Sequence, residues 1–238
     1  MTSTVDNSSL EIANKLLQQG KIQEAVAEYR RGIELTPDLS WHHYYLGEAL
    51  TQLEDWEGAV SAYRQAISLG SNYLCYYRLG VALVKSERWD DAIEVLNQGL
   101  ELKPDYYKFY LPLGQALVHQ QHWEPAMEAY RKAVALKPGV AEFNLQLGYL
   151  LRRHRRFQEA AGYLQRAVDF QGDDPQLQLA LGVALVEGGT DLDRAEGCLR
   201  RSLELQPDQG KPIFIWGNCA RDETSFRRLW GSIVAVGS

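Results

Sequence analysis

Apolar residues recur along this chain at helical spacing, in segments of about 12–15 residues separated by short polar turns. The segments come in pairs, and the pattern predicts two amphipathic helices in each pair. Isolated helices of this length are marginal in water, so each pair needs neighbours on which to bury its apolar sides. We expect six such pairs, numbered here as repeats one to six, over residues 6–39, 40–72, 73–106, 107–140, 141–174 and 175–209.

A Leu-Gly pair marks the first helix of each of the last five repeats, and its glycines are 33, 34, 34 and 34 residues apart. An alanine follows each glycine after twelve or thirteen residues, and a tyrosine or leucine and then a small residue come next. Small residues allow helices to approach closely, and the proline that closes four of the six repeats ends the second helix. The pairs are Leu46-Gly47, Leu79-Gly80, Leu113-Gly114, Leu147-Gly148 and Leu181-Gly182.

This motif, with its period of 34 residues, resembles the tetratricopeptide repeat (TPR). The resemblance implies an all-α fold, a right-handed superhelical solenoid of helix–turn–helix repeats with a concave and a convex side. Residues 1–5 are expected to be a disordered N-terminus. Residues 210–238 carry Trp216-Gly217 where a seventh Leu-Gly pair would stand, and they are expected to be a degenerate seventh repeat whose helices cap the array.

Numbering the places of a repeat so that Leu-Gly holds the seventh and eighth sorts the side chains of the first helix by direction, at about 100° per residue. Places four, seven, eight and eleven face the second helix of the same repeat. Places three and ten suit contact with the neighbouring repeat, which is the prediction for Cys75 and Phe109. Places two, five, nine and twelve form a third sector, which the scaffold does not require to be apolar.

In the TPR family this third sector lines the concave groove where peptides usually bind. Here it is largely apolar and aromatic, which favours an interaction surface. The aromatic and aliphatic members would anchor a ligand, and the polar members would orient it. In the alternative interpretation, the curvature of the solenoid buries part of this strip. The candidate binding residues are Trp41, Tyr44, Tyr77, Val81, Lys108, Leu111, Gln115, Leu145, Tyr149, Arg152 and Leu179.

The resemblance therefore implies a non-enzymatic scaffold or adaptor that binds another protein through a peptide or helix segment. One alternative is that the chain is the N-terminal recognition module of a longer enzyme, such as a glycosyltransferase or sulfotransferase. A third hypothesis is self-association, either by end-to-end stacking or through the groove. Light scattering at several concentrations separates the third hypothesis from the first.

One subclass of the family can be tested on individual residues. TPR adaptors that bind the acidic tails of chaperones use a two-carboxylate clamp, with Lys and Asn at places five and nine of one repeat. Asn at place six of the next repeat follows, and then Lys and Arg at places two and six of the third. Here the corresponding residues are Leu10, Asn14, Tyr45, Leu74 and Arg78. The clamp is therefore not expected in this chain.

The formal net charge of −6 disfavours a general nucleic-acid binder, which needs a basic surface to neutralise phosphates. Cys75, Cys198 and Cys219 are widely spaced and form no CxxC pair, so reduced thiols and a cytoplasmic location are expected. The N-terminal segment has no basic start followed by an apolar run, and the sequence has no apolar stretch of about 18 residues. Neither a secretory signal nor a membrane span is predicted.

The sequence contains no phosphate-binding glycine loop, GxSxG or HExxH motif, and neither catalytic residues nor a cofactor are expected. His119 and His122 have the spacing of a metal pair, but the sequence shows no clear third ligand, although His154 holds a nearby place in the next repeat. Surface histidines are therefore the favoured interpretation. The run of Arg152 to Phe157, RRHRRF, ends a first helix, where solvated basic side chains are normal.

Overall fold

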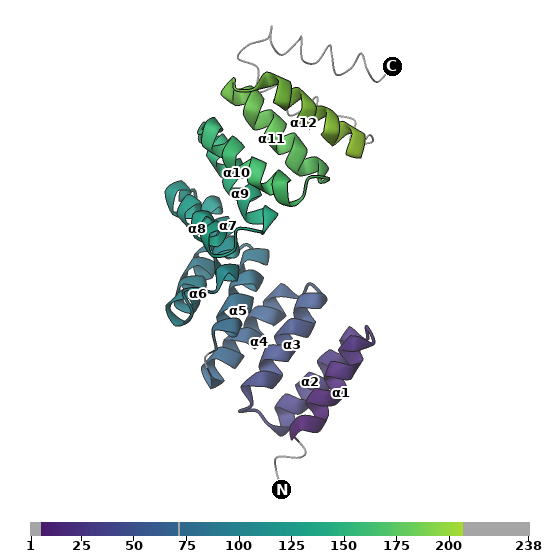
Figure 1. The fold of residues 1–238 in the computed structure, drawn as a ribbon. Coiled ribbons are helices and arrows are strands. Elements are labelled where there is room, and N and C mark those ends of the chain that lie inside the picture. Colours follow the sequence, from purple (N-terminus) through teal and green to yellow (C-terminus); the bar gives the residue numbers. More distant parts are fainter. Residues whose placement is uncertain (1–5, 71, 207–238) are drawn as a thin grey trace. The chain divides into compact units, whose positions relative to one another are not determined.

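The computed structural model describes residues 6–70 and 72–206, which fold into twelve α-helices and one short 3₁₀ helix (Figure 1). Consecutive helices form antiparallel helix–turn–helix pairs, so the predicted all-α repeat architecture is confirmed. The α-helices are α1 (Asp6–Gln18), α2 (Ile22–Leu35), α3 (Ser40–Gln52), α4 (Trp56–Leu69), α5 (Tyr73–Lys85), α6 (Trp89–Leu102), α7 (Tyr110–His119), α8 (Trp123–Leu136), α9 (Ala141–Arg153), α10 (Phe157–Phe170), α11 (Pro175–Gly188) and α12 (Leu192–Leu205).

The chain divides into two compact units, Met1–Ala129 and Tyr130–Ser238, which we call the N-terminal and C-terminal units. In the N-terminal unit α1, α3 and α5 each pack on the second helix of the same repeat, and α2, α4 and α6 each pack on the next first helix. The C-terminal unit repeats this order from α9 to α12. The predictions for residues 1–5 and 210–238 lie outside the described residues, and the repeat boundaries remain predictions.

The Leu-Gly glycines of repeats two, three, five and six face side chains of the second helix of the same repeat. A Cβ atom on Gly80 would lie 2.3 Å from Cδ2 of Leu96, and one on Gly47 would lie 2.6 Å from the ring of Tyr63. Both distances are shorter than van der Waals contact, so only glycine fits at these two places. The recurring alanines of the second helices are fully buried as well: Ala25, Ala59, Ala92, Ala126, Ala160 and Ala195.

Each first helix ends in the same left-handed turn. In repeat three Glu87 has a φ of 59°, and the N–H of Arg88 donates to the carbonyl of Leu83 at 2.9 Å. This is the hydrogen bond of a Schellman motif, in which glycine is the preferred residue at the left-handed position. Only the first and sixth repeats have glycine there. The equivalent residues are Gly20, Glu54, Gln121, Arg155 and Gly189, all with φ between 58° and 75°.

We predict that Glu87→Val lowers the free energy of unfolding by about 1–2 kcal/mol, because a β-branched residue is strained in the left-handed region. Glu87→Gly relieves the strain of a non-glycine residue there and is expected to leave stability equal or higher. Urea denaturation followed by circular dichroism measures both. Equal stabilities of the two variants would show that the turn tolerates any residue.

Contacts between repeats pair a large residue at place three with a small residue on the preceding second helix. Phe109 is fully buried, and its ring would lie 2.4 Å from a Cβ atom on Gly99. His42 is likewise fully buried and packs against Gly32, 2.7 Å from where a Cβ would stand. The prediction that Phe109 contacts the neighbouring repeat is confirmed.

Place four ties the first helices of repeats two, four, five and six to the turn before them. The Tyr110 hydroxyl donates to the carbonyl of Pro104 at 2.9 Å, and the Gln178 amide donates to the carbonyl of Gly172 at 2.8 Å. Asn144, which is fully buried, donates to the carbonyl of Pro138 at 3.3 Å. These bonds satisfy turn carbonyls that the helices leave unpaired.

The first helix of repeat four starts as a 3₁₀ helix, η1 (Tyr107–Phe109), before α7 begins at Tyr110. Pro112 is the third residue of α7 and has no N–H, so the usual hydrogen bond to the carbonyl of Lys108 is missing. The tighter 3₁₀ turn fits this start of the helix. It places Lys108 outside the α-helical part of the repeat.

Candidate functional site

First helices of neighbouring repeats contact one another within each unit: α3 meets α5, α5 meets α7, and α9 meets α11. Their outward sides carry the residues predicted to bind a partner. We call the surface of the N-terminal unit the N-terminal face; its residues are Trp41, Tyr44, Glu48, Tyr77, Arg78, Val81, Lys108, Leu111 and Gln115. The corresponding C-terminal face comprises Leu145, Tyr149, Arg152 and Leu179.

Trp41 is the most exposed aromatic residue of the N-terminal face, with 43% of its surface accessible. Its ring meets Tyr44 edge-on, with 5.6 Å between the ring centroids. Tyr44 is only 8% exposed and also lies 5.9 Å from the ring of Tyr63. Trp41 can therefore contact a ligand. Tyr44, which was also predicted to contact a ligand, is nearly buried and packs against the Trp41 ring.

Tyr77 is half-buried and joins repeats three and four, because its ring lies edge-on to Tyr106 at 5.6 Å and to Phe109 at 5.9 Å. Lys108 is exposed, with its ammonium group 6.0 Å from the centroid of the Tyr106 ring. Three further candidates are half-buried on α5 and α7 and present part of their side chains: Val81, Leu111 and Gln115.

On the C-terminal face, Tyr149 is 37% exposed and Leu145 is nearly buried. Leu179 packs against the buried pair Val183 and Leu199 and is partly accessible. Nη1 of Arg152 lies 3.3 Å from both carboxylate oxygens of Glu187. The charge that was predicted to orient a ligand is thus already paired within the chain.

The candidate residues did not include the main polar feature of the N-terminal face, an ion pair between Glu48 on α3 and Arg78 on α5. Their Oε1 and Nε atoms are 2.8 Å apart. The Tyr63 hydroxyl donates to the same carboxylate at 2.6 Å. The sequence offered one sign of this pair, the opposite charges at place nine of repeat two and place six of repeat three. The spacing within a repeat does not show that these two places are in contact.

Burial raises the pKa of the Tyr63 hydroxyl well above its usual value, and the charge of Glu48 raises it further. Burial by itself would lower the pKa of Arg78, but the Glu48 carboxylate and the Tyr44 hydroxyl outweigh it, so that the pKa is raised. Tyr63 is therefore a protonated donor, and Arg78 remains a cation, throughout the neutral range.

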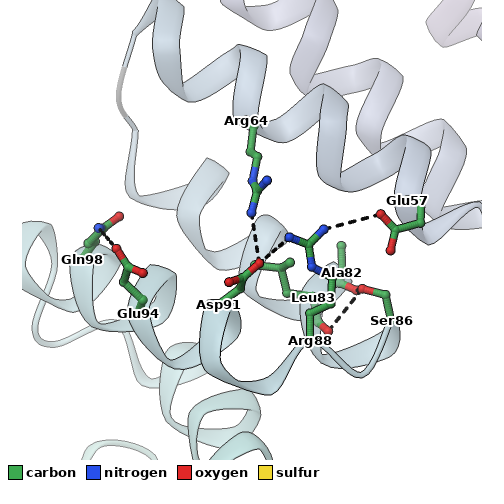
Figure 2. Close-up of polar contacts among 9 residues, drawn as sticks. All are labelled: Glu57, Arg64, Ala82, Leu83, Ser86, Arg88, Asp91, Glu94 and Gln98. Carbon is green, nitrogen blue, oxygen red and sulfur yellow. Dashed lines mark hydrogen bonds and ion pairs between the residues drawn. The ribbon is translucent and has the colours of Figure 1, made fainter.

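Ion pairs also join repeats two and three on the side of their second helices (Figure 2). Asp91 accepts from Arg64 at 3.2 Å and from Arg88, and Arg88 reaches Glu57 at 3.5 Å. A cleft of about 250 Å³ lies beside them and is lined by residues of α4, α5 and α6, including Tyr76 and Asp91. These charges neutralise one another, and the side chains are partly exposed, so each pair stabilises the stack only weakly.

His119 stacks on Trp89 with 3.9 Å between the rings and an interplanar angle of 5°. Among the described residues, no three or more His, Cys, Asp or Glu side chains are grouped so that they could hold a metal ion. In the arginine run, Arg156 binds Glu159 at 2.7 Å and Arg155 occupies the left-handed turn. The structure thus gives Arg152, Arg155 and Arg156 each a local structural role.

Models of the tetratricopeptide repeat match residues 77–141 and 145–210, and related repeat models match residues 13–53 and 44–72. The chain belongs to the tetratricopeptide repeat family. The match covers the repeats on which the helix pairs were predicted, and the TPR resemblance is confirmed. Curated protein sequences contain no significant match to the chain.

Solved TPR structures share the fold at low sequence identity. PilF of Pseudomonas aeruginosa is 21% identical, with a TM-score of 0.73 over 88% of this chain and 95% of that chain. MamA of Desulfovibrio magneticus RS-1 is 23% identical, with a TM-score of 0.68 over 72% and 97%. YrrB, described as a TPR protein with an unusual peptide-binding site, is 24% identical, with a TM-score of 0.63 over 73% and 88%. These likenesses show the fold alone.

The two residues of this TPR chain that agree with the two-carboxylate clamp both have partners within the chain. Asn14 accepts a hydrogen bond from the Tyr29 hydroxyl at 2.7 Å, and Arg78 is paired with Glu48. The other three places of the clamp are held by Leu10, Tyr45 and Leu74. No helix of the described TPR repeats is long and apolar enough to cross a membrane.

Proposed function

We propose that this TPR chain is a non-enzymatic interaction module whose N-terminal face binds a peptide or helix segment of another protein. The exposed ring of Trp41 carries the proposal. With 43% of its surface accessible, it leaves a large apolar area in contact with water, and a ligand that covered this area would gain binding free energy. Half-buried Tyr77 and Leu111 extend the apolar surface onto α5 and α7.

The physical character of this face supports the proposal. Trp41 and Tyr77 are held by edge-on aromatic contacts, so little side-chain freedom is lost when a ligand binds. Tryptophan and tyrosine are the residues that most often dominate binding energy at protein interfaces. The family also favours this function, since TPR arrays typically mediate protein–protein interaction.

We also propose that the protein is located in the cytoplasm. Cys75 and Cys198 are buried free thiols, which suits a reducing location such as the cytoplasm. Burial raises the pKa of both thiols and makes them poor nucleophiles.

Peptides selected by the chain from a displayed library of random segments test the function. For the tightest of them, Trp41→Ala and Tyr77→Ala are each expected to weaken binding by about ten- to a hundredfold, measured by fluorescence anisotropy. Leu102→Ala is the matched control, because Leu102 is an exposed apolar residue at the end of second helix α6, with 52% of its surface accessible. Failure to enrich any peptide, or equal losses in the control, would contradict the proposal.

A further inference from the structure

The Glu48–Arg78 pair lies among the aromatic residues of the N-terminal face. The Arg78 guanidinium stands 5.7 Å from the centroid of the Tyr77 ring. The Glu48 side chain is 21% exposed and that of Arg78 is 39% exposed. A ligand that crosses the face from Trp41 to Tyr77 therefore passes this pair.

Buried groups beneath the face hold the carboxylate of Glu48 in place. The Tyr63 hydroxyl, from a fully buried side chain on α4, donates to Glu48 Oε1 at 2.6 Å. Thr51 stands 3.3 Å from the same hydroxyl, and its own hydroxyl donates to the carbonyl of Gly47 at 2.8 Å. The carboxylate cannot turn away from Arg78 without breaking the bond to Tyr63, so the pair is preorganised.

This geometry decides which charge the face accepts. An arginine on a partly desolvated surface normally attracts carboxylates, because its planar guanidinium matches their two oxygens. Here one carboxylate already occupies Nε at 2.8 Å. A second carboxylate approaching Arg78 would meet the fixed negative charge of Glu48, and like charges brought together in a partly buried site repel each other strongly.

We propose that Glu48 is the specificity residue of the N-terminal face, and that it makes the face select partner segments that are uncharged and apolar or aromatic where they cross Arg78. This inference rests on the proposed binding function of the same face. Glu48 acts by exclusion: it neutralises the arginine and repels acidic segments that the exposed guanidinium would otherwise hold.

The test is selection from one displayed library of random short peptides by four proteins: the full chain and its Glu48→Gln, Glu48→Gln/Arg78→Gln and Glu11→Gln variants. Glu48→Gln is expected to raise the frequency of Asp and Glu in the selected peptides by about tenfold over the parent chain, because Arg78 is left without its partner. The double variant is expected to lose this gain. Glu11→Gln removes the same charge from an exposed position on α1 and controls for the change in net charge.

The outcomes distinguish a failure of this inference from a failure of the proposed peptide-binding function. If no protein enriches any peptide, the binding function itself is wrong and the inference falls with it. If peptides are enriched but Glu48→Gln selects the same charges as the parent chain or as Glu11→Gln, the binding function stands and the inference is wrong. Unchanged circular dichroism and thermal melting of each variant show that the fold is retained.

Discussion

Replacing Phe109 with alanine is expected to lower the free energy of unfolding by about 3–5 kcal/mol. The ring is fully buried between repeats three and four, where it contacts Gly99 and lies edge-on to Tyr77 and Tyr106. Its loss leaves a cavity between α5, α6 and the first helix of repeat four, and the packing of these helices on one another limits how far they can close it. Guanidinium denaturation followed by circular dichroism measures the change.

A double-mutant cycle identifies the contact responsible. Gly99→Ala in the parent chain is expected to cost about 1–3 kcal/mol, because its Cβ would lie 2.4 Å from the Phe109 ring. In the Phe109→Ala chain this cost should fall by at least about 1 kcal/mol, since the ring is gone. Part of the cost should remain, because the added Cβ would still lie 2.9 Å from the Cβ atom of Tyr76. Equal costs of Gly99→Ala in both backgrounds would contradict the packing described for this interface.

The second large effect is expected at Gly80, where alanine should destabilise the chain by about 1–3 kcal/mol. The new Cβ would lie 2.3 Å from Cδ2 and 2.5 Å from Cγ of Leu96, a side chain that is fully buried and cannot move aside. Thermal denaturation of the variant should show a lower melting temperature. Helices α5 and α6 would have to separate to relieve the overlap.

Gly162 provides the control for helix propensity, because it lies within helix α10 and has no neighbouring atom within 4 Å of an added Cβ. Gly162→Ala is expected to raise stability by up to about 1 kcal/mol, as alanine does in an open helix interior. The two glycine substitutions should therefore have opposite signs. A stabilising Gly80→Ala would mean that α5 and α6 do not pack as closely as described.

Much of the fold was predictable because the residues that pack the two helices of a repeat together are close to one another in the sequence. The Leu-Gly pair recurs in five repeats, the alanine in all six and the closing proline in four, and the predicted helix pairs are present. The prediction for Phe109 also succeeded, since the direction of a side chain on a helix follows from its place in the repeat. These inferences need only the helical period.

The candidate site was less predictable, because direction does not determine exposure. Tyr44 and Leu145 point into the predicted sector, yet neighbouring helices cover them almost completely. Arg152 points there as well, but its charge is taken by Glu187 from the next repeat. Both facts depend on how closely adjacent first helices approach, and the sequence spacing within one repeat does not contain that distance.

The sequence alone determined that this protein is a TPR array and in which direction each side chain of a first helix points, because both follow from a local period. Only the tertiary structure decided that Glu48 and Arg78, which are 30 residues apart in the chain, meet at 2.8 Å on the face that carries Trp41. The physical reason is that ion pairing depends on distance and burial, and the stacking of neighbouring repeats sets both.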